Sequence, residues 1–221
     1  DASNEPDRPI PSGRVGGRWG FYIALIATAV SAVVAWLLGP LVFAAALVGL
    51  ALAWAYSAPP FRFKTSGWTG PLVVGMTYEG LSWFTGATVM LGALPRSEVL
   101  IVLVLYSVGA HGIMTLNDFK AVEGDRATGL KSLPVTMGVK GAAQFACGVM
   151  ALAQVIVIAL LAWWGLTVSA VLGSAVLVAQ LFAMPRVLSY PAKFAPWYNA
   201  VGVLLYVLGM LAAALGLGGY V

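Results

Sequence analysis

Charged residues are scarce in this chain of 221 residues. Asp, Glu, Lys and Arg together make up 9% of it, whereas hydrophobic residues make up 61%. An ordinary soluble domain carries roughly 25% charged and 45–50% apolar residues. So little charge excludes a soluble globular domain, and we interpret the chain as an integral, multi-pass membrane protein that has the lipid bilayer as a partner.

Cysteine and histidine are nearly absent as well. The chain contains one cysteine, Cys147, and one histidine, His111. A disulfide framework, a thiolate metal site, and a zinc or haem site all need more of these side chains than the chain holds. The formal net charge of +4 is small and lies in loops, so we expect no nucleic-acid partner; in a membrane protein such charge reports orientation.

What the chain has instead is a series of long apolar runs. Each has about the length that an α-helix needs to cross a hydrocarbon core about 30 Å thick. The sequence therefore predicts an all-α, polytopic membrane helical bundle with about seven transmembrane helices. The runs cover residues 19–38, 41–57, 70–91, 98–116, 141–164, 166–184 and 197–217.

The loops between these runs alternate between short ones and longer basic ones. If every run crosses the membrane, eleven of the twelve Lys and Arg residues fall on one side, and Arg96 falls on the other. The positive-inside rule makes the basic side cytoplasmic. We therefore predict a cytoplasmic N-terminus, an outside C-terminus, and a site shared between cytoplasmic loops.

One polar stretch, LNDFKAVEGDRATGLKSLP at residues 116–134, concentrates the charge. Its carboxylates and cations are Asp118, Glu123, Asp125, Lys120, Arg126 and Lys131. If the preceding helix continues, Asp118 and Asp125 are two turns apart and share a face. Oxygen ligands without His or Cys suit Mg²⁺, which commonly binds one or two carboxylates together with substrate phosphates. The alternative is a solvated loop between two membrane helices.

A second polar loop follows the second apolar run and reads YSAPPFRFK at residues 56–64. The Pro-Pro pair ends the helix and forces an extended path, which brings Tyr56, Arg62 and Lys64 to the membrane surface. The two cations could clamp a diphosphate. They could equally serve as positive-inside anchors beside a belt of aromatic residues.

Glu79 and His111 lie within apolar runs. Glu79 is in the middle of the third run, where a carboxylate costs at least about 2.5 kcal/mol on insertion scales, so it must face the protein interior. It either lines a substrate cavity or is a hydrogen-bonded structural residue. His111 lies seven residues before Asp118 and points either toward a polar substrate or its metal, or into a satisfied interior site.

Two other functional classes fit the composition less well. A transporter or channel could use a buried residue such as Glu79, but transporter sites usually lie near the membrane midplane, whereas the charges here gather at one surface. A non-catalytic assembly subunit would leave Asp118 and Asp125 without a role.

Four segments together resemble the UbiA-type intramembrane prenyltransferases, and specifically their chlorophyll synthase branch. The segments are NEPDRPIPSGR at 4–14, YSAPPFRFK at 56–64, Asn117-Asp118 followed by EGDRATGLKSLPVTMG, and WYNAVGVLLYVLGM at 197–210. They occur in the same order as in that branch and cover essentially the whole chain. The segment HGIMTLNDFKAVEGDR at 111–126 is more similar to the bacteriochlorophyll synthases than to the plant and cyanobacterial enzymes.

The resemblance implies a bundle of nine helices around a cavity that opens to lipid. The implied reaction joins a geranylgeranyl or phytyl diphosphate to the propionate of a bacteriochlorophyllide or chlorophyllide, with Mg²⁺ as cofactor; the alternative is a UbiA-type enzyme with another acceptor. The implied metal ligands are Asp1, Asp118 and Asp125, and the implied catalytic residues are Asp118, Asp125 and Lys131. Candidates for diphosphate contacts are Arg8, Tyr56, Arg62, Lys64, Arg126 and Lys131, and candidates for the cavity wall are Glu79, His111 and Asn117.

The chain departs from the family pattern at its start. The family's first motif, Asn-Asp-x-x-Asp-x-x-x-Asp, is represented only by a final aspartate, Asp1. We interpret residues 1–221 as a single prenyltransferase domain that lacks the first two helices of the family fold, and we expect such a truncated chain to be inactive alone. The expected location is the cytoplasmic or photosynthetic inner membrane, with the active site on the cytoplasmic side and the oligomeric state open.

Overall fold

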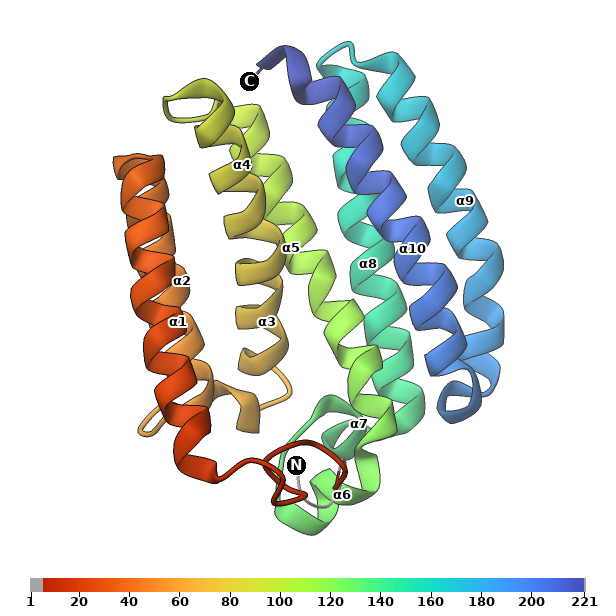
Figure 1. Cartoon of the computed structure of the whole chain (residues 1–221). Coiled ribbons are helices and arrows are strands. Elements are labelled where there is room, and N and C mark those ends of the chain that lie inside the picture. Colours follow the sequence, from red (N-terminus) through yellow and green to blue (C-terminus); the bar gives the residue numbers. More distant parts are fainter. Residues whose placement is uncertain (1–5, 221) are drawn as a thin grey trace.

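Apolar runs form the long helices of this protein, and the polar stretches between them form short ones (Figure 1). The computed structural model describes residues 6–220. The elements are α1 (Gly17–Leu38), α2 (Pro40–Ser57), η1 (Phe63–Thr65), α3 (Thr69–Gly75), η2 (Met76–Leu81), α4 (Ser82–Leu91), α5 (Ser97–Asn117), η3 (Asp118–Lys120), α6 (Val122–Thr128), α7 (Leu133–Thr136), α8 (Gly138–Trp163), α9 (Thr167–Ser189), α10 (Pro191–Leu217) and η4 (Gly218–Tyr220). The predicted all-α membrane bundle is confirmed.

Six helices of the described chain are long and apolar enough to cross a membrane, namely α1, α2, α5, α8, α9 and α10. The third predicted run, 70–91, is not among these six, because its helical segment is divided among α3, the π-helical η2 and α4. Figure 1 shows these elements following one another along the bundle. The described residues therefore form six helices that could span a membrane and one divided helical segment, and the sequence does not predict the π-helical turn in that segment.

The last two long helices extend beyond their predicted bounds. The sequence predicts runs at 166–184 and 197–217, whereas α9 continues to Ser189 and α10 begins at Pro191. Proline suits the first turn of a helix because its missing N–H would have no helical partner there. The polar residues before Trp197 therefore join α10 instead of forming a loop.

The centre of the bundle is α5, which packs closely against α8. Two glycines of α5 make this possible. A Cβ at Gly109 would lie 2.8 Å from the Cβ of Ala153, and one at Gly112 would lie 2.6 Å from Cγ of Met150. In membranes, small residues promote helix association because they let two backbones approach closely. The spacing of α5 and α8 therefore depends on glycine at both positions.

Buried hydrogen bonds link the other long helices to this centre. Gln154 of α8 donates through Nε2 to Oε1 of Gln180 on α9 at 2.7 Å, and the Tyr206 hydroxyl of α10 donates to the Tyr106 carbonyl of α5 at 2.9 Å. All four residues are nearly or fully buried. Such polar contacts fix the register of neighbouring membrane helices, where van der Waals packing alone is less directional.

The first two helices form a hairpin at the side of the bundle. The indole Nε1 of Trp54 donates to the Thr28 hydroxyl at 3.1 Å and joins α2 to α1. Most side chains of α1 are apolar and exposed, as expected where a helix faces lipid. Figure 1 shows this hairpin at one edge, next to the pass made by α3 and α4.

The basic loops meet at one end of the bundle. The segment before α1, the loop after α2, the stretch with α6 and α7, and the turn between α9 and α10 all lie at the lower end in Figure 1. Arg96, in the connection between α4 and α5, belongs to the opposite end. The structure thus gathers the polar segments that the sequence singled out.

The close packing of α5 on α8 predicts that one methyl group added at Gly112 destabilises the protein. Gly112→Ala should lower the free energy of unfolding by about 1–3 kcal/mol, because overpacking forces atoms apart where the new Cβ meets Met150. A drop in the thermal midpoint of the detergent-solubilised protein would show it. Gly148→Ala is the matched control, since a Cβ there meets no atom within 4 Å; equal midpoints for both variants would contradict this account.

Candidate functional site

A polar cavity of about 450 Å³ opens at the end of the bundle where the basic loops meet. Three segments that are far apart in the sequence contribute to its wall: the segment before α1, the loop between α2 and α3, and the stretch after α5. The lining residues are Arg8, Tyr56, Lys64, Ser66, Gly67, Gly70, Pro71, Met114, Asn117, Asp118, Lys120, Ala121, Asp125, Leu130 and Ser132. The cavity therefore combines carboxylates and cations in one place.

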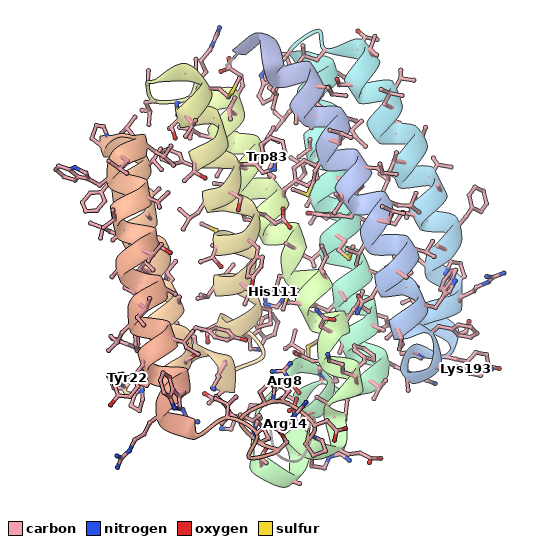
Figure 2. The ribbon with its side chains drawn as sticks, in the orientation of Figure 1. Arg8, Arg14, Tyr22, Trp83, His111 and Lys193 are labelled. Atoms are coloured by element: carbon pink, nitrogen blue, oxygen red, sulfur yellow. The ribbon has the colours of Figure 1, made fainter. Side chains whose placement is uncertain are left out.

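The segment before α1 supplies Arg8. Its turn is closed by backbone hydrogen bonds and by the Arg14 guanidinium, which donates to the Asp7 carbonyl and, at 3.1 Å, to the Ser12 hydroxyl. Figure 2 shows Arg8 and Arg14 at the end of the bundle that carries α6. The folded turn holds Arg8 at the cavity.

The last turn of α2 supplies Tyr56, and the loop after α2 supplies Lys64. Helix α2 ends at Ser57, just before Pro59-Pro60, as the sequence predicts. The chain then turns through Arg62, whose φ of 45° is in the left-handed region, into η1. Arg62 itself is exposed and does not line the cavity, whereas Lys64 two residues later does.

Two backbone hydrogen bonds join this loop to the stretch after α5. The Gly67 N–H donates to the Lys131 carbonyl at 2.8 Å, and the Lys131 N–H donates to the Thr65 carbonyl at 3.1 Å. We call this pair the loop bridge. Gly67 is required for so close an approach, since a Cβ there would lie 2.8 Å from the Lys131 carbonyl oxygen. The loop bridge holds the segment that carries Lys64 against the segment that carries Asp125.

The two aspartates reach the cavity by a route that the sequence did not predict. The expected continuation of α5 through both of them is wrong, because α5 ends at Asn117 and a separate helix, α6, begins after Ala121. The break occurs at Ala121, whose ψ of 5° is not helical. Asp118 and Asp125 still line the same cavity, because the chain turns back at this break.

Electrostatic interactions couple the carboxylates of this cavity. Asp118 interacts repulsively with Asp125 and attractively with Lys120, and Asp125 is 6% exposed. Two carboxylates that share a partly dehydrated cavity repel one another unless a cation neutralises them. The site is therefore suited to a positively charged ligand.

The last helix also reaches this site, through a residue that the sequence analysis did not single out. Asn199 of α10 donates through Nδ2 to Oδ1 of Asn117 at 3.1 Å. Asn199 lies within the segment 197–210, so the resemblance could have identified it. Ser66, Gly67 and Ser132 were missed as well, since no sequence pattern shows that their loops meet.

His111 lines neither this cavity nor the apolar cavity described below. Its Nε2 donates to the Trp68 carbonyl at 3.0 Å, its Nδ1 lies 3.3 Å from the Thr115 hydroxyl, and its ring packs against Trp68 and Phe145. This geometry matches a satisfied interior histidine. Through Trp68, His111 anchors the end of the loop that carries Lys64.

A second, largely apolar cavity of about 630 Å³ lies deeper in the bundle. It shares Tyr56, Met114 and Asn117 with the polar cavity, so the two cavities adjoin. Glu79 is its one acidic lining residue, and the other lining residues are Ala53, Ser57, Val73, Val74, Gly75, Thr77, Tyr78, Ala110, Ile113, Val203 and Val207. The site as a whole has a polar mouth and an apolar interior.

Several predicted residues do not line the polar cavity. Arg126 lies instead on a separate crevice of α6, together with Glu123. Lys131 has an exposed side chain and takes part through its backbone in the loop bridge. Asp1, expected as a metal ligand, lies outside the described residues.

The donor set of the polar cavity fits a metal that shares its ligands with a substrate. Between residues 6 and 220 no group of three or more His, Cys, Asp or Glu side chains could hold an ion unaided. Asp118 and Asp125 supply two carboxylates. Mg²⁺ commonly takes one or two carboxylates and completes its shell with phosphate oxygens and water, so these residues suit it.

Comparison with known proteins gives the family. The model of the UbiA prenyltransferase family matches residues 1–199. The chain is 57% identical to the bacteriochlorophyll synthase 33 kDa chain of Cereibacter sphaeroides, covering 99% of this chain and 72% of that one, and 49% identical to the 33 kDa chain of Rhodobacter capsulatus, covering 100% and 73%.

A solved structure has the same fold. It comes from work on the biosynthesis of digeranylgeranylglyceryl phosphate synthase in membranes, and it superimposes with a TM-score of 0.71 at 22% identity, over 98% of this chain and 75% of its own. The helical bundle is therefore that of a known membrane protein. Together with the family match and the two relatives, this shows that the chain belongs to the UbiA prenyltransferase family.

Proposed function

We propose that this protein transfers a geranylgeranyl or phytyl group from its diphosphate to the propionate carboxylate of bacteriochlorophyllide or chlorophyllide. The observation that carries the proposal is the junction of two cavities. A polar mouth with paired carboxylates and cations adjoins an apolar interior, as a substrate with a diphosphate head and a hydrocarbon tail requires. The names of the two bacterial relatives support the choice of acceptor.

The polar cavity would bind the diphosphate. Asp118 and Asp125 would hold Mg²⁺, which when bound would supply positive charge to the leaving diphosphate. Lys64 and Arg8 line the same cavity and would contact the phosphate oxygens directly. Arginine and lysine stabilise the negative charge that develops on a departing phosphate group, so these residues favour cleavage of the bond.

The apolar cavity would bind the hydrocarbon chain. Cleavage of the allylic C–O bond leaves positive charge on the prenyl carbon, and water would capture that carbon. Val74, Ile113 and Met114 are among the side chains that line this space. Burying the reacting carbon among them excludes water and leaves the acceptor as the available nucleophile.

The acceptor needs no general base. Its propionate has an ordinary carboxyl pKa, about 4–5, and is ionised at neutral pH. A carboxylate oxygen attacks the prenyl carbon, the carbon–oxygen bond to diphosphate breaks, and the electron pair leaves with the diphosphate. No proton is transferred, which agrees with a polar cavity that has no histidine in its lining.

The polar cavity would open to the cytoplasm. The described basic loops share one end of the bundle with it, and cytoplasmic loops of membrane proteins carry an excess of Lys and Arg. The basic loops support this orientation, and we propose the cytoplasmic or photosynthetic inner membrane as the location of the protein. The diphosphate of the donor and the propionate of the acceptor would then both enter from the cytoplasmic side.

Direct assay tests the proposal. Membranes that carry the full-length protein are incubated with bacteriochlorophyllide, geranylgeranyl diphosphate and Mg²⁺, and the product is separated by chromatography. We expect a prenyl ester and free diphosphate in equal amounts. Prenylation of a different aromatic or alcohol acceptor, with none of bacteriochlorophyllide, would overturn the choice of acceptor while keeping the reaction class.

If Asp118 and Asp125 bind the metal, removing the charge of either carboxylate should lower activity. Asp118→Asn or Asp125→Asn should lower turnover at least about a hundredfold, equivalent to about 2.7 kcal/mol of barrier, and should raise the Mg²⁺ concentration needed for half-maximal rate. Glu123→Gln is the matched control, because Glu123 is on the same helix as Asp125 but faces another crevice. Similar losses in all three variants would show that the negative charge of this polar stretch matters and that metal binding by Asp118 and Asp125 does not.

The loop bridge predicts that substrate binding can also be weakened by changing an uncharged residue, Gly67. Gly67→Ala places a methyl group 2.8 Å from the Lys131 carbonyl, and separating the two loops should raise the KM for prenyl diphosphate about tenfold or more, because misplaced binding groups are costly. Steady-state kinetics would measure this. Gly141→Ala, whose Cβ would make an ordinary 3.5 Å contact, should have a normal KM; a normal KM for Gly67→Ala would mean that the loops need no bridge.

A further inference from the structure

The third pass carries an unusual feature beside the apolar cavity. Its middle section, η2, is a π-helical turn, and Glu79 lies within it. π-Helical turns are rare in proteins, and those that occur are often found at functional sites. The extra residue in such a turn redirects the side chains around it. Here the turn places Glu79 among the residues that line the apolar cavity.

The π-helical turn is held tightly against α5. A Cβ at Gly80 would lie 2.7 Å from the Ser107 hydroxyl, and Gly75 packs on the Ser107 carbonyl with no room for a side chain. The Ser107 hydroxyl in turn donates to the Leu103 carbonyl at 2.6 Å. These contacts fix the rotation of the third pass, so the position of Glu79 is set by packing.

The Glu79 carboxylate has no partner of its own within residues 6–220. None of the hydrogen bonds or ion pairs of the described chain involves its side chain, although Tyr206 lies near enough to interact electrostatically. The nearby threonine, Thr77, donates to backbone carbonyls instead. A carboxylate in the middle of a membrane helix is expensive, so a positively charged group of a ligand in this cavity would be a favourable partner.

The proposed substrates offer few groups that a carboxylate would attract. The prenyl chain is hydrocarbon, while the diphosphate and the propionate are both anionic and would be repelled. The positive charge on the prenyl carbon develops only as its bond to diphosphate breaks. In the bound substrates the remaining charged group is the divalent magnesium at the centre of the tetrapyrrole, a hard cation that prefers oxygen ligands. By elimination, the metal of the acceptor is the complement of Glu79.

We propose that Glu79 is a specificity-determining residue that binds the central magnesium of the tetrapyrrole acceptor as its axial ligand. The inference rests on the proposed function, which supplies the acceptor. The carboxylate then selects a metal-bearing macrocycle over the same ring without metal. It also orients the ring at the wall of the apolar cavity, beside the prenyl chain, so that the propionate meets the prenyl carbon where the two cavities adjoin.

Binding measurements without prenyl diphosphate test this role. The protein is titrated with magnesium bacteriochlorophyllide and with metal-free bacteriopheophorbide, and the visible absorption bands are followed because they respond to axial ligation. We expect the unmodified protein to bind the magnesium form at least about tenfold more tightly. Glu79→Leu should bring the ratio to about one, and Glu79→His, which restores a ligand atom, should recover both the preference and the band shift.

The result that would overturn the proposal is a preference that survives Glu79→Leu, or equal binding of both rings by the unmodified protein. If a protonated Glu79 instead donates a hydrogen bond to a ring carbonyl, Glu79→Gln would keep tight binding of both rings and Glu79→His would not restore a band shift, which also overturns it. Failure of the proposed function is a separate outcome, in which the rings bind as described but no ester forms when prenyl diphosphate is added.

Discussion

The polar site of this protein depends on the two backbone hydrogen bonds between Gly67, Lys131 and Thr65. They join the loop after α2 to the stretch after α5, which enter the site from different helices. Without them the cation of one loop and the carboxylates of the other would have no fixed separation. A backbone pairing suits this purpose because it does not depend on side-chain rotamers, and glycine at residue 67 is what permits the approach.

The membrane-spanning helices position the loop bridge. Helix α5 ends at Asn117, where the polar stretch begins, and its close packing on α8 through Gly112 sets where that end lies. His111 adds a second link, because it binds the Trp68 carbonyl at the end of the loop after α2. The same helix thus supports both loops, which explains why a histidine without access to either cavity has both ring nitrogens engaged.

The two adjoining cavities divide the chemistry that a prenyltransferase must perform. Charged groups gather in the polar cavity at one end of the bundle, where the cations beside Asp118 and Asp125 lower the cost of ionising these carboxylates. The interior is largely apolar, and Glu79 is the acidic residue that a π-helical turn directs into it. The reacting bond would lie at the boundary near Tyr56 and Asn117, the residues common to both cavities, where the diphosphate is still solvated by polar groups and the prenyl carbon is already shielded.

By itself the sequence determined the all-α membrane fold, the approximate number of long apolar helices and the segments that carry the candidate site, because apolar length and charge placement are local properties of the chain. It also selected Asp118, Asp125 and Lys64. Only the tertiary structure decided that α5 breaks before Asp125, that Arg126 faces a separate crevice, and that Gly67 meets Lys131. The physical reason is that these outcomes depend on contacts between residues far apart in the chain, which no local periodicity records.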